Sequence, residues 1–123
     1  MRELLFRGKT FNDEWVEGAL VKWSKAHSII RRYGSDTIGL YDYSVISKTV
    51  GQYTGLTDKN GRKIFEGDII VVSTSEKGKT KKYRVEFDNG IFGIRLSTNA
   101  NDNTIIPLRS FDYIEIIKGE END

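Results

Sequence analysis

The sequence predicts a mostly β protein, in which an irregular, β-rich N-terminal part packs on a small C-terminal β-barrel. Short apolar segments alternate with polar residues at the period of two that strands require. Twelve glycines and a single proline mean that the turns between these segments depend on Gly and Asn. At 123 residues the chain is expected to form one domain, 1–123, with subdomains at 1–60 and 61–118 and a tail at 119–123.

The N-terminal third is predicted to contain several short extended segments. The apolar residues at 4–6 form the first strand, which Gly8 ends. Residues 24–34 have the spacing of a helix, at Ala26, Ile29, Ile30 and Tyr33, yet their β-branched and aromatic content favours a strand. Segments 37–43 and 44–50 are predicted to be extended, although either could carry a helical turn.

The segment 15–23 is predicted to be a strand with two different faces. Four residues at even spacing share one face, and Gly18 in the middle indicates a bulge or close packing. Val16 and Leu20 lie on the other face, so the strand is either covered on both sides or twisted. The residues on the first face are Trp15, Ala19, Val21 and Trp23.

The second half of the chain predicts further strands joined by polar loops. The run Ile69–Val72 is β-branched throughout, which is typical of a strand buried on both faces. The clearest hairpin joins alternating residues at 83–87 and 92–96 through Asp88-Asn89-Gly90. Polar loops are predicted at 73–82 and 97–103, and the last strands at 104–108 and 113–118. From about Arg62 onward this order is that of an SH3-like barrel, an analogy that concerns fold alone.

The segment 50–71, here called the signature segment, combines turn residues with an apolar run. Its Asp58-Lys59-Asn60-Gly61 is a tight-turn sequence, because Asn and Gly tolerate positive φ. Glu66-Gly67-Asp68 then opens the strand at 69–72. Each residue therefore has an adequate structural role. The residues of interest are Gln52, Tyr53, Gly55, Leu56, Asp58, Asn60, Gly61, Glu66, Gly67 and Asp68.

These residues resemble the pattern of the YopX family of phage and prophage proteins, which is Q-Y-T-G-L-x-D-K-N-G-x-x-I-[YF]-E-G-D-I. The start at 2–7 and the segment 113–117 are similar to the opening and closing strands of that family. The resemblance supports the predicted fold and implies a phage-encoded or prophage-encoded accessory or regulatory protein of unknown biochemical function. The segment 9–49 departs from the family pattern, so specificity is expected there.

Composition excludes several classes of protein. With 19 Lys and Arg against 18 Asp and Glu, the net charge of +1 gives no global basic field for a polyanion. The chain has no cysteine, which excludes disulfides and thiolate sites and is compatible with a bacterial cytoplasm. No run approaches the roughly 20 apolar residues of a membrane span, and the start lacks the pattern of a signal peptide. We expect a cytoplasmic protein without contact to a membrane.

Two arrangements of carboxylates were weighed as catalytic or metal sites. Asp58, Asn60 and Gly61 resemble part of a calcium loop, but the full pattern would place Leu56 and Gly67 at ligand positions. Glu66 and Asp68 could act as paired carboxylates in a hydrolase. The alternative is that a carboxylate beside a glycine turn accepts backbone N–H bonds and holds the strand entrance. We favour the structural role for both.

The remaining chemistry of the chain argues against an enzyme. His27 is the only histidine, so a triad would depend on it alone and multi-histidine zinc sites are excluded. The common glycine-rich phosphate and nucleophile motifs are absent. We therefore expect no catalytic residues, metal, cofactor or small-molecule substrate.

Two basic clusters make nucleic-acid binding the alternative function. Lysines on a loop can neutralise phosphates and release counterions, but they also protect edge strands from pairing. The candidate contacts are Lys77, Lys79, Lys81, Lys82, Arg31 and Arg32.

The tryptophans carry the leading hypothesis. Even spacing indicates that the face with Trp15 and Trp23 is mostly core. A tryptophan outside the core would instead be a natural anchor for an interface. We therefore expect a non-enzymatic interaction module that binds a protein partner or a second copy of itself.

Overall fold

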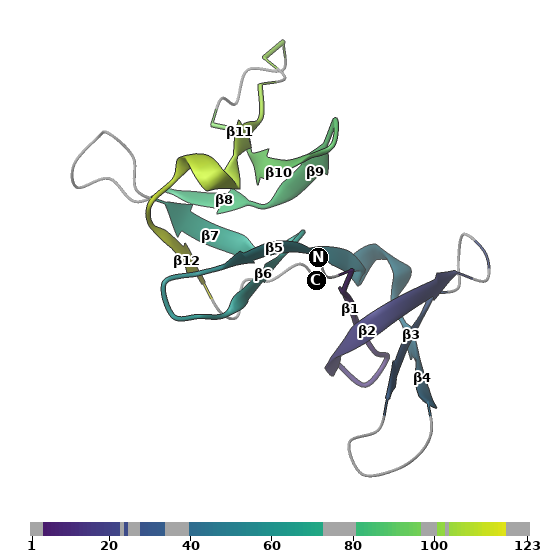
Figure 1. Ribbon diagram of the computed structural model, residues 1–123. Helices are drawn as coiled ribbons and strands as arrows, with labels where there is room; N and C mark the ends of the chain where they lie inside the picture. The colour runs from purple at the N-terminus through teal and green to yellow at the C-terminus, as the bar shows by residue number, and fades with distance from the viewer. Residues whose placement is uncertain are drawn as a thin grey trace. The chain divides into compact units, whose positions relative to one another are not determined.

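The computed structural model describes residues 4–22, 24, 28–33, 40–72, 81–96, 101–102 and 104–117. These residues form antiparallel strands and two short 3-10 turns, with no α-helix among them, which confirms the mostly β prediction (Figure 1). The chain divides into two compact units, Met1–Tyr53 and Thr54–Asn122. The sequence placed a division near residue 60.

The N-terminal unit is built from consecutive antiparallel strands. They are β1 (Phe6–Lys9), β2 (Trp15–Lys22), β3 (Ser28–Tyr33), β4 (Leu40–Val45) and the first part of β5 (Gly51–Thr57). Hydrogen-bonded neighbours follow the order β4-β3-β2-β1-β5-β6, in which β6 is Lys63–Phe65, and the division between the two units falls inside β5. The strand favoured for 24–34 is thus present as β3. A 3-10 turn, Ser47–Thr49, provides the helical turn that was left open for 44–50.

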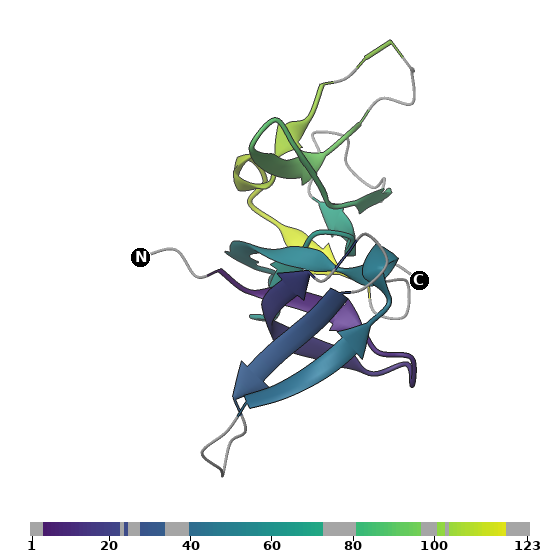
Figure 2. The same cartoon turned by 90° about the vertical axis from the view of Figure 1, so that its right-hand side faces the viewer.

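Close backbone approach shapes the N-terminal sheet, whose purple-to-blue strands face the viewer in Figure 2. Thr10, at the end of β1, forms a bridge with Val45 at the end of β4, and the Ile46 N–H donates to the Lys9 carbonyl at 2.8 Å. Gly18 in β2 allows the strands to approach one another this closely. A Cβ there would lie 2.3 Å from the Arg31 carbonyl oxygen, so Gly18 serves close packing.

The core of the N-terminal unit lies on one face of this sheet. Val16, Ile30 and Val45 are its buried members. Four partly buried residues, Phe6, Leu20, Tyr43 and Val50, pack against them. The core therefore uses the Val16 and Leu20 face of β2. The prediction that the Trp15 face is mostly core is wrong, because the even spacing of strand residues does not say which face is buried.

The C-terminal unit contains β6, which ends the six-stranded sheet, and six further short strands that form two three-stranded sheets. The strands are β6 (Lys63–Phe65), β7 (Ile69–Val72), β8 (Lys82–Arg84), β9 (Glu86–Asp88), β10 (Ile91–Ile94), β11 (Ile106–Pro107) and β12 (Ile114–Ile116). A 3-10 turn, Leu108–Ser110, separates β11 from β12. The sheets have the orders β12-β7-β8 and β11-β10-β9. Within the described residues these strands form no closed barrel, so the SH3-like barrel is not confirmed.

Val85 separates β8 from β9 and assigns them to different sheets. Its N–H donates to the Asp68 carbonyl and its carbonyl accepts the Gly67 N–H, both at 2.9 Å. β8 pairs with β7, whereas β9 pairs with β10. The backbone of Val85 thus bonds to the loop at Gly67 where the strand passes from one sheet to the other.

The hairpin predicted at Asp88-Asn89-Gly90 is present between β9 and β10. Asp88 and Ile91 are paired, so the loop has two residues, Asn89 and Gly90. Both have positive φ, at 52° and 78°. This is the combination that two-residue hairpins with a type I′ turn require.

The core of the C-terminal unit takes only one face of β7. Ile70 and Val72 are buried, while Ile69 and Val71 are only partly buried. The prediction of a strand buried on both faces is therefore wrong. In an antiparallel sheet packed on one side, the second face stays open to solvent even when its residues are apolar. The buried members of this core are Ile64, Ile70, Val72, Val85, Ile94, Leu108, Ile114 and Ile116.

Candidate functional site

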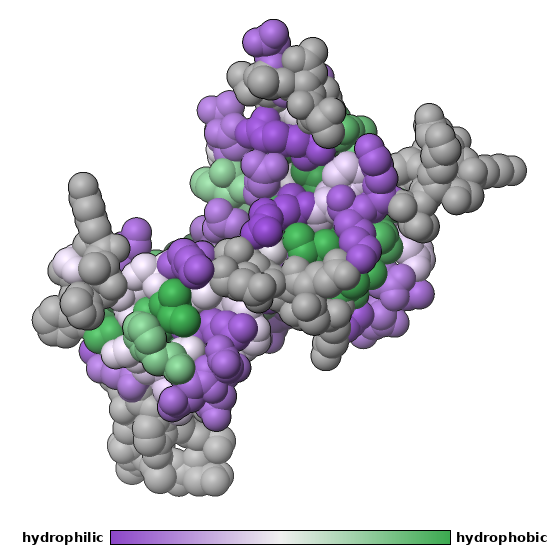
Figure 3. Space-filling model, turned by 180° about the vertical axis from the view of Figure 1, so that it is seen from behind, coloured by the Kyte–Doolittle hydropathy of each residue, from purple (hydrophilic) through white to green (hydrophobic). Residues whose placement is uncertain are grey.

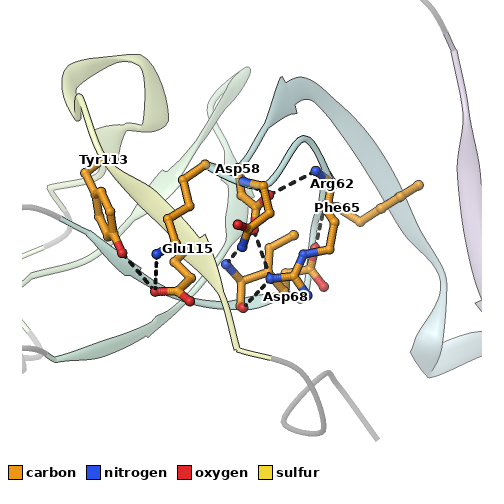
Figure 4. Close-up of polar contacts among 9 residues, drawn as sticks. Asp58, Arg62, Phe65, Asp68, Tyr113 and Glu115 are labelled. Atoms are coloured by element: carbon orange, nitrogen blue, oxygen red, sulfur yellow. Dashed lines mark hydrogen bonds and ion pairs between the residues drawn. The ribbon is translucent and has the colours of Figure 1, made fainter.

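The turn of the signature segment is organised by the buried carboxylate of Asp58 (Figure 4). Its Oδ1 accepts the backbone N–H groups of Asn60 and Arg62, both at 2.9 Å. Its Oδ2 accepts the N–H of Ile116, 58 residues further along the chain, at 3.1 Å. Asp58 therefore holds its own turn and the last strand together.

The same turn provides hydrogen-bond donors for the backbone carbonyls at the outer edge of β12. The Lys59 N–H donates to the Ile114 carbonyl at 2.9 Å, and Arg62 Nη2 donates to the Ile116 carbonyl at 3.2 Å. Arg62 Nη2 also lies 3.2 Å from Asp58 Oδ2. An edge strand whose backbone groups are already bonded offers no template for another strand. The turn thus covers the edge of β12.

The charge of Asp58 is stabilised by these bonds. Burial raises the pKa of a carboxyl, but the N–H groups of Ile116, Arg62 and Asn60 and the nearby Arg62 guanidinium outweigh it. The pKa of Asp58 is therefore lowered below its ordinary value. Among the described residues, no group of three His, Asp or Glu side chains could hold a metal ion.

The second carboxylate of the segment, Asp68, faces its own turn. It is buried, and its Oδ2 accepts the Phe65 N–H at 2.8 Å (Figure 4). The Asp68 N–H returns a bond to the Phe65 carbonyl at 3.1 Å, across Gly67 with a φ of 94°. This geometry is that of a strand entrance held by a carboxylate. Glu66 is partly exposed beside it.

The earlier residues of the segment lie along β5. Gln52 is paired with Phe6 of β1, and the Tyr53 N–H donates to the Leu5 carbonyl at 2.8 Å. Gly55 has a φ of 88°, which a side chain rarely adopts. Leu56 packs against the C-terminal core. These four residues therefore contribute pairing, a backbone conformation and packing.

The basic residues of the nucleic-acid hypothesis are only partly described. Lys77 and Lys79 lie outside the described residues, as does the side chain of Arg32. Lys81 and Lys82 are exposed. Arg31 Nε donates to Asp42 Oδ1 at 2.8 Å and its Nη2 to Asp42 Oδ2 at 3.2 Å. The guanidinium of Arg31 is therefore engaged in a bidentate surface ion pair with Asp42.

The surface that the sequence did not assign correctly is the outward face of the N-terminal sheet, here called the Trp15 face. Strand pairing places Val21 opposite Ile29, and Ala19 opposite Arg31. Trp15, Val21 and Ile29 are partly buried and Ala19 is exposed, and none of them belongs to the core cluster. The face consists of Arg7, Lys9, Trp15, Glu17, Ala19, Val21, Ile29 and Arg31.

Two cations fix the position of Trp15 on this face. The Arg7 guanidinium carbon lies 4.5 Å from the centroid of the Trp15 ring, and Lys9 Nζ lies 5.8 Å from it. Such contacts are favourable and keep the ring against β1. Trp23 and His27 lie outside the described residues. In the N-terminal unit, hydrophobic residues reach the surface among hydrophilic ones (Figure 3).

Sequence reasoning missed Phe11, which lies in the turn between β1 and β2. Its exposed fraction is 74%, the largest of any bulky apolar residue in the described part of the chain. The segment Phe11-Asn12-Asp13-Glu14 has no apolar periodicity, so a pattern search passes over it. The available signal was an aromatic residue inside an otherwise polar turn.

Comparison with known proteins identifies the chain. The family model described as YopX protein matches residues 5–117. The chain belongs to the YopX family. No curated protein matches it. The crystal structure of protein EF1440 from Enterococcus faecalis is similar, with a TM-score of 0.54 and 21% identity over 95% of this chain and 92% of that chain. At this identity the likeness concerns the fold alone.

In the described residues, no helix is long and apolar enough to cross a membrane.

Proposed function

We propose that this YopX protein is a non-enzymatic interaction module that binds another protein through the Trp15 face. The observation that carries the proposal is that Trp15, Val21 and Ile29 lie outside the core cluster, on the face opposite the packed one. Aromatic and branched side chains on one sheet face provide the apolar centre that protein interfaces use. The charged residues Glu17 and Arg31 would form a polar rim, while the Arg7 guanidinium lies against the Trp15 ring.

The sheet presents this face in a defined shape. The bridge between Thr10 and Val45 and the tight approach at Gly18 fix how the strands coil. A surface that is already ordered loses little conformational entropy when it binds. A function of this kind is consistent with an accessory or regulatory role. Encoding by a phage or prophage and location in the bacterial cytoplasm are parts of the same proposal.

The test uses the tagged protein isolated from its own host cells. Ala19 is exposed, so Ala19→Glu should fold and should place a bulky carboxylate at the centre of the face, where it would disturb an apolar contact with a partner. Ser110→Glu is the matched control, because it adds the same charge at an exposed position of the other unit. We expect a bound protein, or self-association seen by light scattering, that Ala19→Glu abolishes and Ser110→Glu preserves. A monomer without any co-purifying protein would reject the proposal.

Nucleic-acid binding is the alternative, supported by the exposed Lys81 and Lys82 at the start of β8. The pairing of Arg31 with Asp42 weakens it, since a phosphate would have to compete with that carboxylate for the guanidinium. Fluorescence anisotropy at low salt tests it with single-stranded and duplex DNA and RNA. Binding that falls steeply as salt rises would support it, and no binding at low salt would dispose of it.

A further inference from the structure

Phe11 is exposed on a turn that is held by many hydrogen bonds. The Thr10 N–H donates to the Glu14 carbonyl at 2.8 Å, and the Asp13 N–H donates to the Thr10 carbonyl at 3.1 Å. Thr10 Oγ1 accepts the N–H groups of Asn12 and Glu14 at 3.3 and 3.2 Å. The turn therefore has a defined conformation, including a φ of 64° at Asp13. Exposure of Phe11 is not the result of a missing local structure.

The base of the turn is also anchored. The Lys9 N–H donates to Thr49 Oγ1 at 2.9 Å, and Thr49 Oγ1 donates to the Ile46 carbonyl at 2.6 Å. Thr10 and Thr49 are both buried. These contacts tie the turn to the 3-10 turn that follows β4. Phe11 is thus presented by a fixed scaffold, and an exposed apolar side chain on such a scaffold is suited to insertion into a partner.

The residues beside Phe11 specify the charge of that partner. Asn12, Asp13 and Glu14 are all exposed, and the Asp13 side chain is 85% exposed. The ion pair of Asp13 with Lys9 spans 3.8 Å, which is a weak surface contact. Two exposed carboxylates therefore lie in the same turn as Phe11. They would repel nucleic-acid phosphates and anionic lipid headgroups and attract Lys and Arg.

We propose that the turn Phe11–Glu14 is a docking knob for a partner protein. Phe11 enters an apolar pocket of the partner, and Asp13 and Glu14 pair with Lys or Arg side chains on the rim of that pocket. Strand pairing places Lys9 opposite Trp15, so the knob adjoins the Trp15 face. The inference rests on the proposed function and adds the chemistry of the partner to it.

Site-specific photo-crosslinking in the native host cells tests the knob. The photoreactive residue p-benzoylphenylalanine replaces Phe11 in one variant and Ala19 in a second. We expect the variant at position 11 to crosslink to one protein, at a site lined by apolar residues with Lys or Arg beside it. Neutralisation by Asp13→Asn with Glu14→Gln keeps the turn, because Asn tolerates positive φ, and should remove most of this product.

A measurement with the purified partner then gives the size of the effect. Phe11→Ala should weaken binding at least about tenfold, as for an aromatic anchor, while Phe11→Leu should recover part of it. Circular dichroism confirms that each variant is folded. Rising salt should weaken the wild type more than the neutralised variant, because only the wild type depends on the rim charges.

The outcomes separate the two proposals. A product from Ala19 but none from position 11 overturns the knob and leaves the Trp15 face in place. No product from either position overturns both. A product at position 11 that is a lipid, a nucleic acid, a second copy of this chain or a protein site without basic residues overturns the knob.

Discussion

Single residues in the signature segment act through backbone groups rather than through exposed chemistry. Asp58 accepts three backbone N–H groups, one of them from β12, and Asp68 accepts one across its own glycine turn. A buried carboxylate is costly unless such bonds stabilise its charge. The residues that make the segment recognisable therefore stabilise the C-terminal unit.

The first prediction concerns the stability that Asp58 provides. Asp58→Ala should lower the free energy of unfolding by about 3 kcal/mol or more, because the N–H groups that Asp58 accepts and the Arg62 charge then lose their partner. Asp58→Asn should cost less, since one acceptor oxygen is kept. Urea unfolding followed by circular dichroism measures both. Asp112→Asn, at an exposed carboxylate, is the control and should change the value by less than about 0.5 kcal/mol.

The pH dependence of stability follows from the lowered pKa of Asp58. The folded protein then binds fewer protons than the unfolded chain, whose Asp has a pKa of about 3.9. The stability from Asp58 is therefore present above that value and is lost as the pH falls through the folded pKa. We expect the free energy of unfolding to fall more steeply below pH ~4 in the wild type than in Asp58→Asn. Equal slopes in urea titrations from neutral pH into this range would contradict the assignment.

At the scale of elements, the N-terminal sheet depends on small residues where strands approach closely. A Cβ on Gly8 would lie 2.9 Å from Val45 Cβ and Cγ2, whereas a Cβ on Gly18 would meet the Arg31 backbone. Side chains can be exchanged for smaller ones, but backbone cannot. The two glycines therefore differ in how their substitution can be rescued.

A double-mutant cycle tests this difference. Gly8→Ala should destabilise the protein by about 1–3 kcal/mol through overpacking, and Val45→Ala should destabilise it by leaving a cavity. The double mutant should lose at least about 0.5 kcal/mol less unfolding free energy than the two single mutants lose together, because the new methyl group occupies part of that cavity. Chemical denaturation of the four proteins gives the coupling. Gly18→Ala combined with Val45→Ala serves as the comparison and should show no such gain.

For the whole molecule, two cores stabilise two units, and among the described residues these cores share no buried member. The N-terminal core centres on Ile30 and the C-terminal core contains Ile94, both fully buried. The chain has two tryptophans, Trp15 and Trp23, and both belong to the N-terminal unit. Tryptophan fluorescence is thus a local probe, while circular dichroism reports on all strands.

The last prediction uses this distribution of probes. Ile30→Ala and Ile94→Ala should each remove about 2–5 kcal/mol from the unit that contains them. We expect Ile30→Ala to shift the unfolding midpoint seen by tryptophan fluorescence, and Ile94→Ala to shift mainly the midpoint seen by circular dichroism. If Ile94→Ala moved the fluorescence midpoint as far as Ile30→Ala does, the chain would unfold as one cooperative unit.

The sequence predicted those features that depend on neighbouring residues. Alternation predicted β2, β-branched and aromatic content favoured β3, and Asn89-Gly90 predicted a two-residue hairpin, because strand propensity and steric limits on φ are local. Phe11 was missed because exposure leaves no periodic pattern. The sequence anticipated the surface of the candidate site only through the alternative of a tryptophan outside the core.

The tertiary structure alone decided which face of each strand is buried and which distant groups meet. Period-two alternation is the same whether Val16 or Trp15 faces the core, and only packing against Ile30 and Val45 selects Val16. The bond from Ile116 to Asp58 joins residues 58 positions apart, so no local pattern contains it. By itself the sequence determined the strands, the turns and the family resemblance, because these depend on local sterics and on the order of residues. Burial and long-range hydrogen bonds depend on the folded chain, and they placed the Trp15 face and Phe11 at the surface.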